Sequence, residues 1–351
     1  MYIFLAIIAF LIMILLHEFG HFITAKLCGV RVDEFAIGMG PAIWKKQIGE
    51  TLYALRIIPL GGYCAMAGED GELPDDPRAF TNQTPWKRAI ILVAGAAMNF
   101  LTGLILLVVV FSHSGAVNVP VIGSFFEGCP YESADGLQVG DEFYSIDGHR
   151  IWFAGNVSEY LARGGDTHDI VLVRGGEKLR LDDYTMTRRT YPDMEGEYYG
   201  FRFQPITDPT FGQNMKYSWY CAEDFVRMVY SSLRDLFAGA VGVKDLAGPV
   251  GIVSMINDVG QTSQSTADAL LNICYFIAFI SVNLAVMNLL PIPALDGGRI
   301  FLLIVTALIE AVIRRKIDPK YEGYIHTAGL VLLLGLMAFI MYQDIARIIT
   351  K

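Results

Sequence analysis

The sequence predicts a polytopic α-helical membrane protein with about four transmembrane helices and an inserted β-rich domain. The first observation is composition, because 53% of the 351 residues are hydrophobic and only 18% are charged. A soluble protein usually has about 25% charged residues. The second is that the apolar residues collect in helix-length runs. The third is a long interval of short β-like runs separated by glycine and aspartate.

Composition also excludes several classes of protein. The formal net charge is −9 and charged residues are scarce, which argues against a surface that binds nucleic acid. Five cysteines in 351 residues are too few for a disulfide-rich secreted scaffold. A membrane protein with water-soluble parts remains, because the few charges must be concentrated in particular segments.

The first apolar segment is long enough to cross a bilayer. Residues 2–16 contain no polar group apart from the tyrosine hydroxyl, and a helix over residues 2–25 is about 36 Å long at ~1.5 Å per residue. A cleaved signal peptide is the competing interpretation. We disfavour it because no basic residue precedes Tyr2 and no small-residue cleavage site follows Leu16.

The remaining spans and their orientation follow from apolar runs and basic loops. Residues 89–111, 269–290 and 327–341 are the expected second, third and fourth spans, and residues 300–313, too short to cross alone, continue a broken third span. Loops rich in Lys and Arg stay in the cytoplasm. Such loops precede the second and fourth spans. Both termini and residues 112–267 are therefore expected outside.

The outer region has a β-rich pattern of its own. Short β-like runs occupy residues 117–203, and GLQVGDEFYSIDGHRI (136–151) resembles the central signature of PDZ domains, which bind peptides as an added strand at a sheet edge. A different small β domain is the plainer interpretation. Residues 216–246 then predict an amphipathic helix. This helix would lie on the outer membrane surface or pack on the β-rich domain.

A polar motif interrupts the first span. His17, Glu18 and His21 form HEFGH, and positions 17 and 21 lie one above the other on a helix. Two imidazoles at this spacing bind one metal ion while the adjacent carboxylate serves as a general base. Ionisable groups inside a span are costly and mark functional sites. Two buried structural histidines are the plainer interpretation, but it leaves Glu18 in the bilayer without a partner.

The histidine pair requires a further ligand, because catalytic zinc usually takes three protein ligands and a water. Asp296 in NLLPIPALDGGR (288–299) is the best candidate. Pro291 and Pro293 break the third span just before it, and irregular backbone at membrane depth is tolerated only where it is buried or lines a watery cavity. A plain turn with a solvent-facing aspartate is the alternative.

HEFGH in the first span, together with LDGG in the third, resembles the site-2 protease family of intramembrane zinc metalloproteases. Within it the chain is similar to the bacterial RseP-like type, the regulator of sigma-E protease. The similarity runs through nearly the whole chain, and its further segments are IPLGGYCAMAGE (58–69), AGAAMNF (94–100), GPVGI (248–252) and SVNLAVMNLLPIPALDGG (281–298). Two features depart from the family pattern. Ala96 stands where proline is usual, and only a single PDZ-like domain fits between the second and third spans.

The resemblance implies a set of site residues. One Zn²⁺ ion per chain is expected on His17, His21 and Asp296, with Glu18 as the catalytic base. Residues 58–69 resemble the family's membrane-reentrant β-loop, which is expected to hold the substrate extended beside the zinc. The implied substrate-binding residues lie on this loop and on the third span, where Asn288 resembles the contact to the substrate backbone; they are Gly61, Gly62, Tyr63, Asn283 and Asn288.

The resemblance also implies a function. We expect a zinc metalloendopeptidase, a hydrolase that cuts transmembrane segments of single-span substrates in regulated intramembrane proteolysis. Anti-sigma factors or signal-peptide remnants, first trimmed by an upstream site-1 protease, are the expected substrates. The expected location is the bacterial inner (plasma) membrane, with the lipid bilayer around the spans, the active site toward its cytoplasmic half and no nucleic-acid partner. The PDZ-like domain lies outside as a size filter or a C-terminus reader.

Two rival functions come from other classes. A proteolytically inactive PDZ membrane scaffold should have lost Glu18 or a metal ligand, and none is lost. A zinc transporter predicts repeated broken helices, whereas the sequence contains a single broken helix and no internal repeat.

The expected domain organisation divides the chain into eight segments. They are the first transmembrane helix (1–26), a cytoplasmic and reentrant β-loop region (27–87), the second transmembrane helix (88–112), the PDZ-like domain (113–205), an extracytoplasmic amphipathic helix and linker (206–267), the broken third helix (268–313), a cytoplasmic loop (314–325) and the fourth transmembrane helix (326–346).

Two smaller questions stay open. Gly95, Asn99 and Gly103 recur every four residues and make a small face suited to helix packing. Either packing alone or direct support of the site by Asn99 explains them. Cys129 and Cys221 both lie in the outer region, where they either form a disulfide or remain separate thiols.

Overall fold

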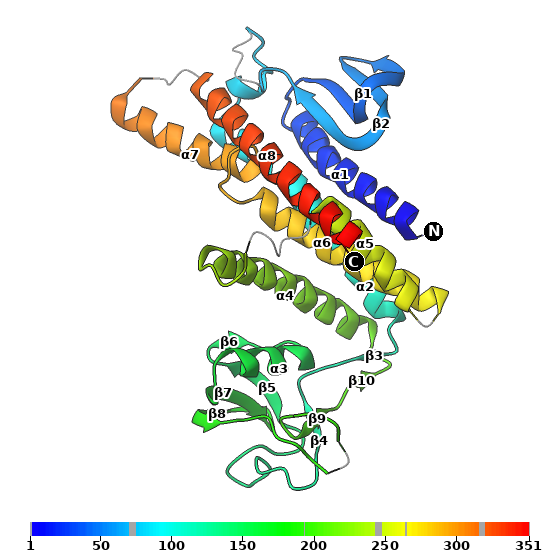
Figure 1. Cartoon of the computed structure of the whole chain (residues 1–351). Coiled ribbons are helices and arrows are strands. Elements are labelled where there is room, and N and C mark those ends of the chain that lie inside the picture. The colour runs from blue at the N-terminus through cyan, green and yellow to red at the C-terminus, as the bar shows by residue number, and fades with distance from the viewer. Residues whose placement is uncertain are drawn as a thin grey trace. The chain divides into compact units, whose positions relative to one another are not determined.

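The computed structural model describes residues 2–69, 75–192, 194–242, 248–263, 265–315 and 320–350. The chain forms two compact units, one made of Met1–Leu107 with Phe225–Lys351 and the other of Val108–Asp224. Long helices and a β-hairpin make up the first unit, and short strands dominate the second (Figure 1).

Four helices among the described residues are long and apolar enough to cross a membrane. They are α1 (Tyr2–Leu27), α2 (Pro85–His113), α6 (Thr266–Asn288) and α8 (Lys320–Thr350), the last with its apolar stretch at Gly323–Ala346. By length and composition, these helices confirm the four expected spans. After α6 the chain breaks at residues 289–295, and α7 (Asp296–Ile313) follows as a separate helix.

The interval expected to hold an amphipathic helix and a linker contains two helices. The first, α4 (Phe211–Phe237), begins and ends earlier than the predicted residues 216–246. The second, α5 (Pro249–Thr262), was not predicted, although Pro249 at its first turn is a helix-start signal. Side chains of α1, α5 and α6 share one buried core, made of Ala6, Met13, Ile256, Ile273 and Ile280. Residues 249–262, which fall in the expected helix and linker segment, are therefore a helix that packs with α1 and α6.

Helix α8 holds the start of α5 in place. The buried carboxylate of Asp344 accepts hydrogen bonds from the backbone N–H groups of Gly248 and Gly251, each at 2.9 Å. The first N–H groups of a helix have no partner within the helix, so this carboxylate replaces the cap that a local side chain would supply. The GPVGI segment is thereby joined to α8.

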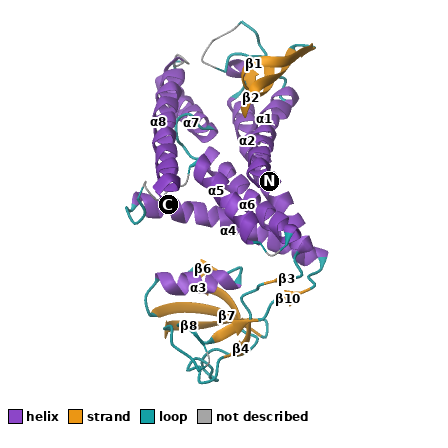
Figure 2. Cartoon of the chain, turned by 45° about the vertical axis from the view of Figure 1, so that its right-hand side comes forward, coloured by secondary structure: helices purple, strands orange, loops and turns teal. Residues whose placement is uncertain are grey.

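The hairpin between α1 and α2 is built from β1 (Val32–Ile48) and β2 (Thr51–Met66), which pair antiparallel. Residues 34–37 of β1 pair both with residues 62–65 and with residues 52–55. Within the described residues, the segment 62–65 therefore has a strand on one side only. Figures 1 and 2 show the hairpin at the C-terminal end of α1.

The second unit is a β-rich fold with one short helix. Its elements are β3 (Ala116–Val117), β4 (Ile122–Phe125), β5 (Glu142–Ile146), β6 (His149–Arg150), α3 (Ala154–Arg163), β7 (Thr167–Arg174), β8 (Glu177–Thr185), β9 (Phe201–Phe203) and β10 (Ile206–Thr207). The strands form one sheet in the order β6-β5-β7-β8 and the pairs β4-β9 and β10-β3. Figure 2 shows α3 beside the sheet, and Val157 and Leu161 of this helix belong to its core.

Two elements of this unit were absent from the sequence prediction. Helix α3 is short, and β8 (EKLRLDDYT) alternates charged and apolar residues without a β-branched run. The tight turn before β8 uses Gly175 and Gly176, both with positive φ, as two-residue hairpin turns require. Cys129 and Cys221 are both free thiols, which answers the question of their pairing.

Candidate metal centre

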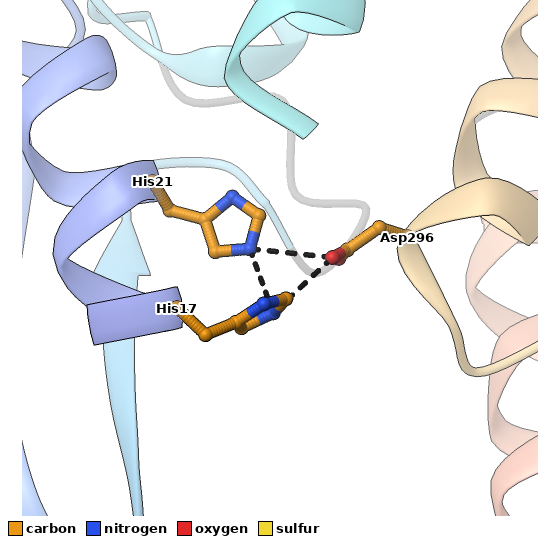
Figure 3. Close-up of side chains that lie close together, drawn as sticks. All are labelled: His17, His21 and Asp296. Atoms are coloured by element: carbon orange, nitrogen blue, oxygen red, sulfur yellow. Dashed lines mark hydrogen bonds and ion pairs between the residues drawn. The ribbon is translucent and has the colours of Figure 1, made fainter. Parts of the chain in front are cut away.

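Three side chains from two distant parts of the chain converge on one point. On α1, the Nε2 atoms of His17 and His21 lie 3.2 Å apart. An Oδ2 oxygen of Asp296, the first residue of α7, lies 3.3 Å from each of them (Figure 3). Within the described residues, these three form the one group of His, Cys, Asp and Glu side chains close enough to hold a metal ion.

The break between α6 and α7 positions Asp296 next to the two histidines. Ala294 adopts a left-handed backbone conformation, with φ of 79°, which is uncommon for a residue other than glycine. Its backbone N–H donates to Nδ1 of His326 on α8 at 3.2 Å. A Cβ atom at Gly297 would collide with the backbone of Leu289. The turn is therefore compact, held by α8 and dependent on a glycine beside the aspartate.

The orientation of His21 is set by α2. Its Nδ1 atom lies 2.8 Å from the carbonyl oxygen of Ile91, so Nδ1 carries the hydrogen and donates. In the neutral ring, Nε2 then has a lone pair directed at His17 and Asp296. Gly95 passes so close that a Cβ atom there would collide with both imidazole rings.

The donor set fits a divalent zinc ion. Zinc–ligand distances of about 2.0–2.2 Å and tetrahedral angles separate neighbouring ligand atoms by about 3.3–3.5 Å. The three observed separations, 3.2, 3.3 and 3.3 Å, are close to that range. The Asp296 oxygen is buried and has no hydrogen-bond donor among the described residues. Lone pairs gathered this closely repel one another unless a cation lies between them.

Glu18 lies beside this cluster, next to the hairpin. A Cβ atom at Gly62 of β2 would lie 3.6 Å from Cγ of Glu18 and 2.9 Å from the carbonyl oxygen of Ala36. Glycine at position 62 therefore allows this segment to lie close to the Ala36 carbonyl, while a Cβ atom there would make only ordinary contact with Glu18. Gly61 has a φ of 79°, and the hydroxyl of Tyr63 accepts a hydrogen bond from the Arg56 guanidinium.

Two asparagines approach the opposite ring nitrogen of His17. Nδ2 of Asn99 on α2 lies 3.3 Å from Nδ1 of His17, and Nδ2 of Asn288 lies 3.4 Å from the same atom. Asn283, a substrate-binding candidate, makes no hydrogen bond to the cluster within the described part of the chain. The structure brings together five of the nominated polar residues: His17, Glu18, His21, Asn288 and Asp296.

Sequence reasoning missed several residues that support the site. Arg299, one turn after Asp296, pairs with Glu69 at the end of the hairpin. His326 contacts the turn at Ala294. Glu69 closes the segment IPLGGYCAMAGE, and one arginine follows LDGG, but no spacing rule connects such distant positions.

Fold and site together define a class of protein: a helical membrane protein with a two-histidine, one-aspartate candidate metal centre and an adjacent glutamate. The chain belongs to Peptidase family M50, whose model matches residues 5–336.

Several relatives are named as zinc metalloproteases. The chain is 39% identical over 348 residues to one from Clostridium perfringens, with 98% of both chains covered. It is 34% identical over 345 residues to one from Clostridium acetobutylicum, covering 97% of this chain and 96% of the relative. The zinc metalloprotease RasP of Shouchella clausii is 28% identical over 432 residues, with 98% of this chain and 99% of the relative covered.

Proposed function

We propose that this peptidase is an intramembrane zinc metalloendopeptidase that cuts the transmembrane segments of single-span proteins. The convergence of His17, His21 and Asp296 within a fold of membrane-length helices is the observation that carries the proposal. Family membership and the names of the relatives support the same chemistry.

The proposed roles follow from the donor set. His17, His21 and Asp296 hold the zinc ion, which when bound makes a water more acidic and polarises the scissile carbonyl. Glu18 accepts a proton from the attacking water and passes it to the leaving amine.

The hairpin supports a specific mode of substrate binding. A helical substrate hides its peptide bonds in internal hydrogen bonds, so a stretch must become extended before it is cut. The segment 62–65 is paired with β1 on one side, and Gly62 brings it close to Glu18. An extended substrate would add as a strand along Gly61, Gly62 and Tyr63. In this proposal the hairpin is a membrane-reentrant β-loop, and Asn288, with Asn283, binds the substrate backbone.

The second unit is proposed to be a PDZ-like domain that controls access. Its β-rich core and the signature at residues 136–151 favour this assignment. It would lie outside the bacterial inner membrane and act as a size filter or a C-terminus reader. Substrates would be anti-sigma factors or signal-peptide remnants first cut by an upstream site-1 protease. The segment between the first and second spans is rich in Lys and Arg, which favours the cytoplasmic side for the hairpin that lies in it. Products would therefore leave toward the cytoplasm.

A cleavage assay tests the proposed function. The purified full chain in detergent is incubated with a model single-span substrate, alongside Glu18→Gln and wild type treated with a zinc chelator. We expect cleavage by wild type, loss of cleavage in both controls and recovery when zinc is returned. Wild-type rates in Glu18→Gln would exclude the assigned base, and full activity in chelator would exclude the metal.

A further inference from the structure

The side chain of Asn99 is buried against the metal centre. It comes from the middle of α2, is 2% exposed and places its amide nitrogen 3.3 Å from Nδ1 of His17. Asn288 places its amide nitrogen 3.4 Å from the same atom. Two amides thus compete for one ring nitrogen.

The tautomer of His17 determines whether its Nδ1 atom donates or accepts a hydrogen bond. Nε2 of His17 faces Asp296 and His21, so this atom is the metal ligand and must be unprotonated. A neutral imidazole then carries its hydrogen on Nδ1, which becomes a donor. A donor requires an acceptor, so one of the two asparagines must present its amide oxygen. Metal-binding histidines commonly have such a partner on their second nitrogen.

The surroundings favour Asn99 for this role. Its Oδ1 atom is buried and has no hydrogen-bond partner among the described residues. A half-turn of the amide exchanges oxygen and nitrogen and gives that oxygen the His17 N–H. The backbone is held as well, because the Ser281 hydroxyl donates to the Asn99 carbonyl at 2.7 Å.

Glycines on the same face of α2 keep Asn99 close to its neighbours. One turn before it, Gly95 contacts the imidazoles, and one turn after it a Cβ atom at Gly103 would lie 2.7 Å from Val282. Asn288 differs, since it is the last residue of α6 and is partly exposed.

We infer that Asn99 is a positioning residue for the metal centre: its amide oxygen accepts the Nδ1–H of His17 and holds the ring for zinc. Asn288 is then free to turn toward a substrate. The inference rests on the proposed zinc site. It assigns Asn99 to the orientation of His17 and Asn288 to contact with the substrate. This role also explains why Asn99 lies between Gly95 and Gly103 on the small face of α2. Helix packing alone would not require an amide at that position.

Zinc affinity is the direct readout. The full chain in detergent is titrated with zinc against a chromophoric chelator, and cobalt is bound in its place so that visible absorption reports ligand geometry. Asn99→Leu and Asn99→Ala should weaken zinc binding about 10–100-fold and alter the cobalt spectrum. Asn99→Asp keeps an acceptor of the same shape and should bind zinc at least as tightly as wild type.

Asn288→Leu gives the matched comparison. It should leave zinc affinity and the cobalt spectrum unchanged and lower kcat/KM for a model substrate. Thr102→Val, on the same helix and with a hydroxyl that donates to the Met98 carbonyl at 2.7 Å, should change neither property. The alanine side chain is smaller than that of asparagine and cannot clash with its neighbours. Asn99→Ala therefore provides the measurement if Asn99→Leu does not fold.

Two outcomes would overturn the inference. One is wild-type zinc affinity in both Asn99→Leu and Asn99→Ala. The other is an Asn99→Asp variant that loses zinc as the apolar variants do. Failure of the zinc site itself is distinguishable, because His17→Ala would then bind zinc as tightly as wild type.

Discussion

Arg299 forms an ion pair with Glu69 and so connects the helix that carries Asp296 to the hairpin that passes Glu18. The second carboxylate oxygen of Glu69 accepts the backbone N–H of Met66 at 3.3 Å. Both charged side chains are largely buried, with exposed fractions of 27% for Arg299 and 18% for Glu69. This ion pair thus links the helix that begins with a proposed metal ligand to the end of the proposed substrate strand.

Breaking this ion pair should impair catalysis more than zinc binding. Glu69→Gln is expected to lower kcat/KM about tenfold or more, because a hydrogen bond to a charged group contributes about 1.5–3 kcal/mol. The measurement is cleavage of a model substrate together with a zinc titration. Glu50→Gln removes another glutamate that is paired with arginine in the hairpin region, Arg78, and should have little effect. Equal losses in both variants would contradict the specific role of Glu69.

A methyl group at Gly95 should destroy the metal centre. The Cβ atom of Gly95→Ala would overlap both imidazole rings, so the rings must move apart and zinc content should fall well below one ion per chain. Gly155→Ala is the matched control, since a Cβ atom there meets nothing within 4 Å. Metal analysis of the purified variants is the measurement. Full zinc occupancy in Gly95→Ala would show that the site adapts to the added carbon.

The hydrogen bond from Ala294 to His326 should matter for the position of Asp296. His326→Leu removes the acceptor for the partly buried Ala294 N–H, and a donor left without a partner costs up to about 1–3 kcal/mol. We expect weaker zinc binding and a lower unfolding temperature. His326→Asn retains an acceptor near the position of Nδ1 and should restore most of both. Identical behaviour of the two variants would argue against the hydrogen bond.

The stability of the second unit should fall in acid through Asp147. Burial raises the pKa of Asp147, but hydrogen bonds from His168 and from the Asp169 N–H, each at 2.8 Å, outweigh it and the pKa lies below its usual range. A depressed carboxylate pKa stabilises the folded state above the unfolded pKa of about 3.9. That stability is lost as the pH falls through the folded pKa.

Hydrogen–deuterium exchange over residues 142–173 of the full chain, corrected for intrinsic exchange rates, measures this effect. Wild type should lose protection below about pH 4. Asp147→Asn should be less protected at neutral pH and change less with acid. Asp182→Asn, at a carboxylate with 61% exposure, should behave like wild type. A wild-type acid response in Asp147→Asn would assign the effect to other carboxyl groups.

Sequence reasoning succeeded where the signal was local or compositional. Apolar runs of helical length predicted the four spans, since length and hydropathy alone decide whether a helix can cross a bilayer. It missed α5, whose glycine-containing start is capped by Asp344 from α8 rather than by a neighbouring side chain. It also missed α3, which is ten residues long, and β8, whose charged and apolar residues alternate without a β-branched run.

The sequence by itself determined the pairing of His17 with His21, because residues four apart meet on one helical face whatever the rest of the chain does. It also nominated Asp296, through the break that surrounds it. Only the tertiary structure decided that Asp296 reaches the two imidazoles, that Gly95 leaves room for them and that Asn99 stands behind His17. These contacts join residues far apart in sequence, and their distances depend on how helices pack, which no local periodicity specifies.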